Sequence, residues 1–99
     1  MKILITSSGK EVKSNMDKRF GRAPWFCIYD QKQQTTTFIE NGNSESQGGA
    51  GTKTAEKMIE LGIEQIFSGQ FGPKAKSLLE KFNIQMVEID DEISIEALL

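Results

Sequence analysis

The sequence predicts an α/β domain built on a five-stranded mixed sheet, and three observations on its 99 residues support this fold class. Three strand-like segments separated by polar stretches occupy the first 40 residues. Apolar residues then recur with helical spacing in two later segments. A short strand-like segment follows each of these helical segments. The apolar content of 37% and the charged content of 26% are typical of a globular chain, so we expect a single domain over residues 1–99.

The first three strands are expected at residues 2–6, 25–30 and 35–40. Residues 2–6 (KILIT) form a short apolar run, which suits a buried strand. Residues 25–30 (WFCIYD) follow Pro24 and are rich in aromatic side chains. Residues 35–40 (TTTFIE) are β-branched but polar, which suits the edge of a sheet. Because only the polar segment 31–34 joins the second strand to the third, we expect an antiparallel meander.

Two helices alternate with two further strands in the second half of the chain. The first helix ends at Gly62 and precedes a strand at residues 64–68. Pro73 suits the first position of the second helix, which ends at Asn83 before a strand at residues 85–89. A last short helix is expected at residues 93–99. The apolar stripes of the two main helices are Ala55, Met58, Ile59 and Ile63, and Ala75, Leu78, Leu79 and Phe82.

The element order β-β-β-α-β-α-β-(α) predicts how the sheet is connected. Each strand–helix–strand unit should be a right-handed parallel crossover. The strands then take the order 3-2-1-4-5, which is the ribonuclease H-like arrangement. Both crossovers run in the same direction across the sheet, so both helices should lie on one face. The C-terminal helix or a partner must cover the other face.

The composition argues against several classes of protein. A net charge of −2 gives no electrostatic basis for general nucleic-acid binding. No apolar run approaches the roughly 20 residues that span a bilayer, and the start MKILITSS is too short for a signal peptide. We therefore expect a cytoplasmic protein that binds neither nucleic acid nor membrane.

The chain also lacks the residues of familiar catalytic sites. It has no histidine, no P-loop motif and no G-x-S-x-G motif. A ribonuclease H-type nuclease would need metal-binding carboxylates on its first and fourth strands, yet these read KILIT and EQIFS, with Glu64 alone at a strand start. We therefore expect a non-enzymatic protein.

A ligand site is expected at the carboxyl ends of the parallel strands, as in other open α/β sheets. The loops 7–9, 69–72 and 90–91 meet there, and the glycine-rich loop 48–52 opens a helix nearby. Helix N-termini offer N–H groups to an anion, and the only two arginines of the chain lie close together before the second strand. The predicted ligand-binding residues are Arg19, Arg22, Ser8, Gly48, Gly49, Gly51, Thr52, Gly69, Gln70 and Gly72.

Each of these features also has a purely structural interpretation. The glycines can simply form turns and caps, and the arginines can pair with Asp17 or Asp30 to hold a turn in which Phe20 and Trp25 are core residues. Cys27, the only cysteine, is by default a small buried hydrophobe. The alternative is a thiolate ligand for a metal or an iron–sulfur centre. One thiolate cannot close a cluster site, so this alternative needs a second copy of the chain or a cluster with ligands of its own.

The chain resembles the dinitrogenase iron–molybdenum cofactor biosynthesis family, the small NifX/NafY-type domain that also occurs at the end of NifB. The resemblance rests on five sequence elements and on the last helix. These elements are MKILITSSG at the start, DKRFGRAPWF at 17–26, Asn41 after the third strand, GGAG at 48–51 and LGIEQIFSGQFGPKA at 61–75.

This resemblance implies a ribonuclease H-like domain that holds an iron–sulfur or iron–molybdenum cofactor precursor and passes it on unchanged. It also implies a cluster-donor or cluster-acceptor protein as partner. A homo-oligomer is compatible with the resemblance as well. Family members often carry histidine where this chain has Arg19 and Gln47, so two soft nitrogen ligands are replaced. The alternative function is a metal-free protein-interaction or regulatory module that uses the same fold.

Overall fold

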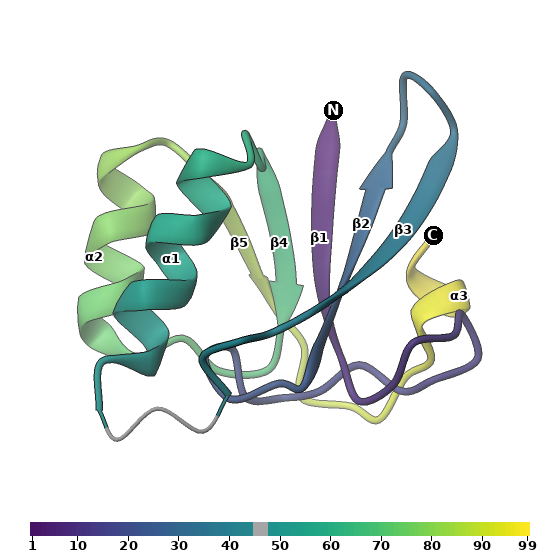
Figure 1. Cartoon of the computed structure of the whole chain (residues 1–99), viewed down its shortest axis with the longest axis horizontal. Coiled ribbons are helices and arrows are strands. Elements are labelled where there is room, and N and C mark those ends of the chain that lie inside the picture. Colours follow the sequence, from purple (N-terminus) through teal and green to yellow (C-terminus); the bar gives the residue numbers. More distant parts are fainter. Residues whose placement is uncertain (45–47) are drawn as a thin grey trace.

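The computed structural model describes residues 1–44 and 48–99 and shows one mixed sheet flanked by helices (Figure 1). The five strands are β1 (Lys2–Ser7), β2 (Trp25–Asp30), β3 (Thr35–Glu40), β4 (Gln65–Ser68) and β5 (Gln85–Glu88). They lie in the order β3-β2-β1-β4-β5. β1 pairs antiparallel with β2 and parallel with β4; β2 and β3 are antiparallel, and β4 and β5 are parallel. The predicted fold class and strand order are therefore confirmed.

The helices are α1 (Ala50–Glu60), α2 (Pro73–Lys81) and α3 (Ile95–Leu98). α1 begins inside the segment expected to be a loop, and α3 is shorter than predicted. β2 and β3 have the predicted bounds, while β1 extends one residue further, to Ser7. Among the described residues, no helix has the length and apolar character needed to cross a membrane.

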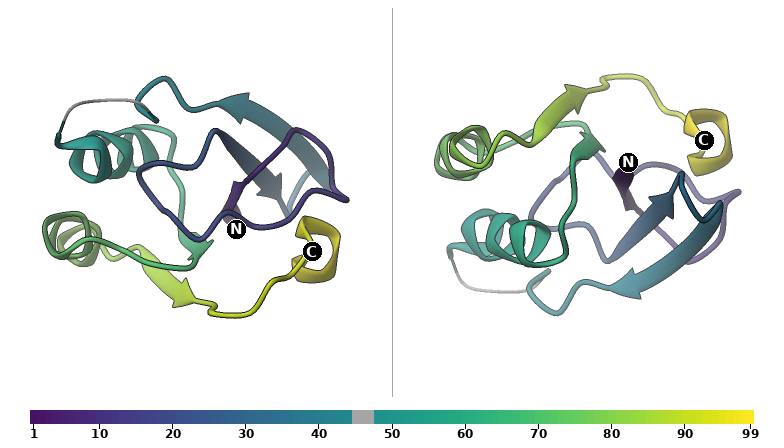
Figure 2. Two further views of the ribbon diagram at one scale, coloured as in Figure 1. Left: turned by 90° about the horizontal axis from the view of Figure 1, so that it is seen from below. Right: turned by 90° about the horizontal axis from the view of Figure 1, so that it is seen from above.

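The two faces of the sheet carry separate cores. Leu4 of β1 and Phe26 of β2 pack with buried residues of α1 and α2, such as Met58 and Leu79. The alternate residues of the same strands, such as Ile5 and Cys27, pack with Ile95 of α3 on the opposite face. Figure 2 shows α1 and α2 together on one side of the sheet and α3 on the other. The predicted placement of the helices is therefore confirmed, and α3 contributes to the second face.

The predicted apolar stripe of the second helix extends beyond the residues that are buried in the core. Ala75 and Leu79 are buried, but Leu78 is only half-buried. Phe82, the last residue of the predicted stripe, lies just beyond the helix and is 51% exposed. The apolar stripe therefore extends beyond the core, because helical periodicity shows which side chains share a face but not how far the neighbouring layer reaches.

Candidate functional site

The arginine-bearing segment, which we call the arginine turn (residues 17–23), lies at the carboxyl ends of the parallel strands. The Phe20 N–H donates to the carbonyl of Gln70 over 3.3 Å, and the Gln70 N–H donates to the carbonyl of Lys18 over 2.8 Å. These two bonds pair the turn with the loop that follows β4. The arginine turn therefore lies beside the carboxyl end of β4, where ligands of open α/β sheets bind.

Buried hydroxyl groups anchor the start of the arginine turn. The Thr6 hydroxyl donates to the carbonyl of Asp17 over 2.5 Å and lies 2.7 Å from the Ser68 hydroxyl. The Asp17 N–H donates to the carbonyl of Thr6 over 2.8 Å. Thr6 and Ser68 lie on the adjacent strands β1 and β4 and have no solvent exposure. These bonds connect the turn to the centre of the sheet.

Two glycines allow the backbone segments around the site to approach closely. A Cβ atom on Gly21 would lie 2.6 Å from the backbone nitrogen of Gly51, in the first turn of α1. A Cβ atom on Gly69 would lie 2.6 Å from the Cα atom of Lys18. Real Cβ atoms do not come this close to backbone atoms, so only glycine fits at either position. The arginine turn is therefore packed between α1 and the loop after β4.

The guanidinium of Arg19 forms a two-pronged pair with Asp17. Nε donates to one carboxylate oxygen over 3.1 Å, and Nη2 donates to the other over 2.9 Å. The Arg19 backbone N–H also donates to Asp17, over 2.9 Å. The Arg19 side chain is nevertheless 64% exposed. The hydrogen bonds to Asp17 fix the orientation of the Arg19 side chain. Because a guanidinium has five N–H donors, the two that bind Asp17 leave others for a ligand.

The pair also changes the acidity of both groups. Burial raises the pKa of the Asp17 carboxyl group, but hydrogen bonds from the side chain and backbone of Arg19, together with its positive charge, outweigh this effect. The net pKa of Asp17 lies below its ordinary value. The hydrogen bond and charge of Asp17 raise the pKa of Arg19. Asp17 is thus an anion that holds a permanent cation at the rim of the site.

Arg22 lies on the other side of the turn. Its Nη1 donates to the backbone carbonyl of Ser44 over 3.2 Å. Asp30, which we considered as an arginine partner, instead accepts the N–H groups of Lys32 and Gln33 in the β2–β3 turn. Arg22 therefore connects the arginine turn to the segment that leads toward α1.

A hollow of about 400 Å³, which we call the central hollow, opens between the arginine turn and the starts of α1 and α2. It is lined by residues 19–22, by residues 49–51, and by Gln70 and Gly72. Gly49 and Gly72 are the N-caps of the two helices, and neither helix start has a side-chain cap. Uncapped helix starts leave backbone N–H groups and positive dipole ends for an anion. Both arginines and both helix starts thus converge on one space.

The structure brings six of the ten predicted ligand-binding residues to the central hollow: Arg19, Arg22, Gly49, Gly51, Gln70 and Gly72. Ser8 lines a side hollow of about 300 Å³, whose lining also includes Asp17 and Glu92 and shares Arg19 with the central hollow. Thr52 faces a groove between α1 and α2. Gly48 and Gly69 line none of these three spaces; Gly48 takes a left-handed φ of 135°, and Gly69 permits the close contact with Lys18.

Sequence reasoning missed three residues that line the central hollow, Phe20, Gly21 and Ala50, and it missed the supporting role of Asn41. Phe20 lines the hollow while being almost fully buried, and its ring centroid lies 5.0 Å from that of Phe71. Asn41 does not line the hollow, but its side chain holds the arginine turn in place. An asparagine directly after a strand is the only local signal for this role, and it also fits an ordinary turn.

Cys27 lies away from the central hollow. It has no solvent exposure and packs in the core beneath α3. Burial raises the pKa of its thiol to about 11, so the thiol is neutral near pH 7. In the described part of the chain, no group of three or more His, Cys, Asp or Glu side chains could hold a metal ion. These features favour the interpretation of Cys27 as a small hydrophobe. Gln47, the other position where relatives carry histidine, lies outside the described residues.

The fold and the central hollow define a small ribonuclease H-like domain with a space lined by N–H donors at the carboxyl ends of its parallel strands. The chain belongs to the dinitrogenase iron–molybdenum cofactor family, whose sequence model matches residues 1–99. This family is associated with the biosynthesis of that cofactor. No curated protein matches the sequence at a significant level.

Solved structures show the same fold. The apo form of the orange protein from Desulfovibrio gigas is 26% identical, with a TM-score of 0.90; the match covers 98% of this chain and 82% of that one. An NMR structure from Thermotoga, assigned to the DUF35 family and named as a candidate NifB protein, is 24% identical, with a TM-score of 0.81. That match covers 96% of this chain and 80% of the other.

Proposed function

We propose that this chain is a non-enzymatic carrier for an anionic metallocluster or cofactor precursor of the iron–sulfur type, held in the central hollow. The single observation that carries the proposal is the convergence of Arg19 and Arg22 with two uncapped helix starts on one space. Membership of the iron–molybdenum cofactor family supports a ligand of this class, and the likeness to a protein solved in an apo form supports the presence of a ligand site.

The lining of the central hollow suits hydrogen bonding rather than metal coordination. Among the described residues that line it, Arg19 and Arg22 are the only charged ones, and none of these residues has a carboxylate, thiol or imidazole group. A cargo bound there would keep its own complete set of ligands and present anionic sulfur or oxygen atoms to N–H donors. Phe20 would contact an apolar part of the cargo. Because no bond to a metal would have to break, such a cargo could pass intact between a donor and an acceptor protein.

The test is an anaerobic titration of the purified chain with a synthetic [4Fe–4S] cluster anion that carries small thiolate ligands. We expect saturable binding that survives gel filtration, read as visible absorbance and as iron per chain. The Arg19→Ala/Arg22→Ala variant should bind at least tenfold more weakly, since each lost charge-assisted hydrogen bond is worth about 1.5–3 kcal/mol.

The matched control is Lys13→Ala/Lys32→Ala, which removes the same charge from exposed positions outside the hollow. It should change the affinity less than twofold, because charges beyond a Debye length of about 8 Å are screened at physiological salt. Absence of saturable binding, or equal losses in both variants, would contradict the carrier proposal.

A metal-free protein-interaction or regulatory module is the second candidate function. The observation that favours it is the 64% exposure of Arg19 on a turn that backbone contacts hold in place, since such a guanidinium also suits the carboxylate of a partner protein. This alternative predicts a chain that stays colourless throughout the titration. It also predicts a purified partner whose binding is lost in the double arginine variant.

A further inference from the structure

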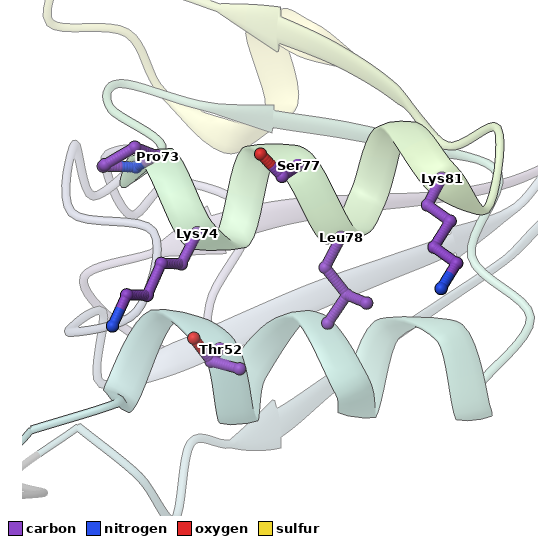
Figure 3. Close-up of a pocket in the computed structure, with 6 residues that line it drawn as sticks. All are labelled: Thr52, Pro73, Lys74, Ser77, Leu78 and Lys81. Atoms are coloured by element: carbon purple, nitrogen blue, oxygen red, sulfur yellow. The ribbon is translucent and has the colours of Figure 1, made fainter.

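A second concave surface, which we call the helix groove, runs between α1 and α2 and is separate from the central hollow. It encloses about 550 Å³ and is lined by Thr52, Pro73, Lys74, Ser77, Leu78 and Lys81. Figure 3 shows Leu78 pointing from α2 toward α1 at the middle of the groove. Lys74 and Lys81 extend toward α1 on either side of it (Figure 3).

The helix groove holds apolar surface that the fold does not use. Ala75 and Leu79 are buried in the core, and Leu78 packs against the same core but stays half-buried, so part of its side chain remains accessible in the groove. Phe82, four residues after Leu78, is 51% exposed at the end of the helix. Phe82 does not line the groove, but it directly follows the lining residue Lys81, so this exposed aromatic residue adjoins the end of the groove. Apolar surface of this kind is typical of a contact site.

The charge of the helix groove has one sign. Of the described residues that line it, the two charged ones are both lysines, although the chain as a whole carries a net charge of −2. Lys74 and Lys81 are seven residues apart, which places their Cα atoms about 10.5 Å apart along α2 at a rise of about 1.5 Å per residue. Two turns of a helix laid in the groove would span the same distance. A suitable occupant therefore carries acidic groups at this spacing and apolar groups between them.

We propose that the helix groove docks an acidic amphipathic helix of a partner protein. Two carboxylates, seven residues apart in the partner, pair with Lys74 and Lys81, and leucine-like side chains between them pack on Leu78. This is the helix-in-groove mode of recognition. The groove adjoins the central hollow, since Thr52 directly follows Gly51 and Pro73 directly follows Gly72. A docked helix therefore lies beside the hollow, where a protein that loads or unloads a ligand would have to bind.

The test uses the ¹⁵N-labelled full chain without any metal, so its outcome is independent of the carrier proposal. The probe is a synthetic helical peptide with Glu at positions i and i+7 and Leu at i+3 and i+4. We expect saturable shifts of the amide resonances of residue 52 and residues 74–82. Lys74→Glu/Lys81→Glu should weaken binding at least tenfold, whereas the matched Lys13→Glu/Lys32→Glu variant should change it less than twofold. Unchanged circular dichroism of both variants would show that they fold.

Several results would overturn the proposal. A peptide with Lys in place of both Glu residues should not bind; equal binding would remove the charge argument. Peptide shifts confined to other surfaces would show that the groove is not the site. Shifts of the groove residues with decanoate but not with the peptide would assign the groove to small amphiphiles. The same shifts on raising the protein concentration alone, with a dimer in sedimentation, would assign it to a second copy of the chain.

Discussion

The side-chain amide of Asn41 donates a 2.8 Å hydrogen bond to the backbone carbonyl of Ala23, a residue 18 positions earlier in the chain. The same Nδ2 group donates to the carbonyl of Gly21 over 3.1 Å, and the amide oxygen accepts the Asn43 N–H over 2.9 Å. Asn41 is only 3% exposed. One buried amide therefore holds both the arginine turn and the start of the segment that leads into α1, and it positions residues of the central hollow without lining it.

Replacing Asn41 should loosen the arginine turn. Asn41→Ala removes both donors and leaves the two carbonyls without their partner, so we expect a loss of about 2–3 kcal/mol of unfolding free energy. Urea denaturation followed by circular dichroism measures this loss. Asn43→Ala is the control, because Asn43 contributes its backbone N–H to the network and should cost less than about 0.5 kcal/mol. Equal effects of the two substitutions would show that the Asn41 side chain does not hold the turn.

A side chain at position 21 should force the arginine turn away from α1. The Cβ atom of Gly21→Ala would meet the backbone of Gly51 and Ala50, which cannot rotate aside. We expect a loss of about 1–3 kcal/mol in urea denaturation. We also expect shifted amide resonances in residues 49–51. Gly42→Ala is the matched control, since its Cβ atom would have no neighbour within 4 Å. A Gly21→Ala variant as stable as the Gly42→Ala variant would refute the close packing.

The pair between Asp17 and Arg19 should make stability depend on pH in the acid range. The folded-state pKa of Asp17 is lowered, so its contribution is complete above the unfolded-state pKa of about 3.9 and is lost as the pH falls through the lower folded-state value. At pH 7 the Asp17→Asn variant should be less stable than the natural chain by about 1 kcal/mol, because solvent screens the exposed guanidinium.

The difference in unfolding free energy between these two chains should shrink between pH 4 and pH 2, where Asp17 becomes protonated. Urea denaturation at pH 7 and at the lowest pH where both chains remain folded measures it. Asp91→Asn is a suitable control, since Asp91 is exposed. If the difference in unfolding free energy between the natural chain and Asp17→Asn did not vary with pH, the charge of Asp17 would not contribute to stability.

Cys27 should behave as a core residue. With its thiol fully buried and its pKa raised to about 11, only about one molecule in a thousand carries the thiolate at pH 8, and Ellman's reagent should react slowly until urea unfolds the chain. Cys27→Ala should cost about 1–2 kcal/mol and leave binding of the [4Fe–4S] probe unchanged. Rapid reaction in the folded chain, or loss of probe binding in this variant, would make Cys27 a ligand instead.

Local patterns in the sequence determined most of the fold. The alternating and β-branched runs placed β2 and β3 at their observed bounds, because strands depend on residues that are close in sequence. The helical spacing of apolar residues and Pro73 predicted the position of α2. Because parallel crossovers are right-handed, the element order then predicted the single strand order that the structure shows. The extent of the apolar stripe was not predictable, since the exposure of Phe82 depends on where the facing layer ends.

The sequence by itself also indicated the region of the central hollow, through two arginines and two glycine-rich helix starts. Only the tertiary structure decided which residues meet there. In the structure Ser8 lines the side hollow and Thr52 lines the helix groove. Arg19 forms its ion pair with Asp17 rather than with Asp30. The contacts that build the hollow, such as Gly21 with Gly51, join residues far apart in the chain. Local propensity carries no information on such contacts, because they form only when the sheet brings its loops together.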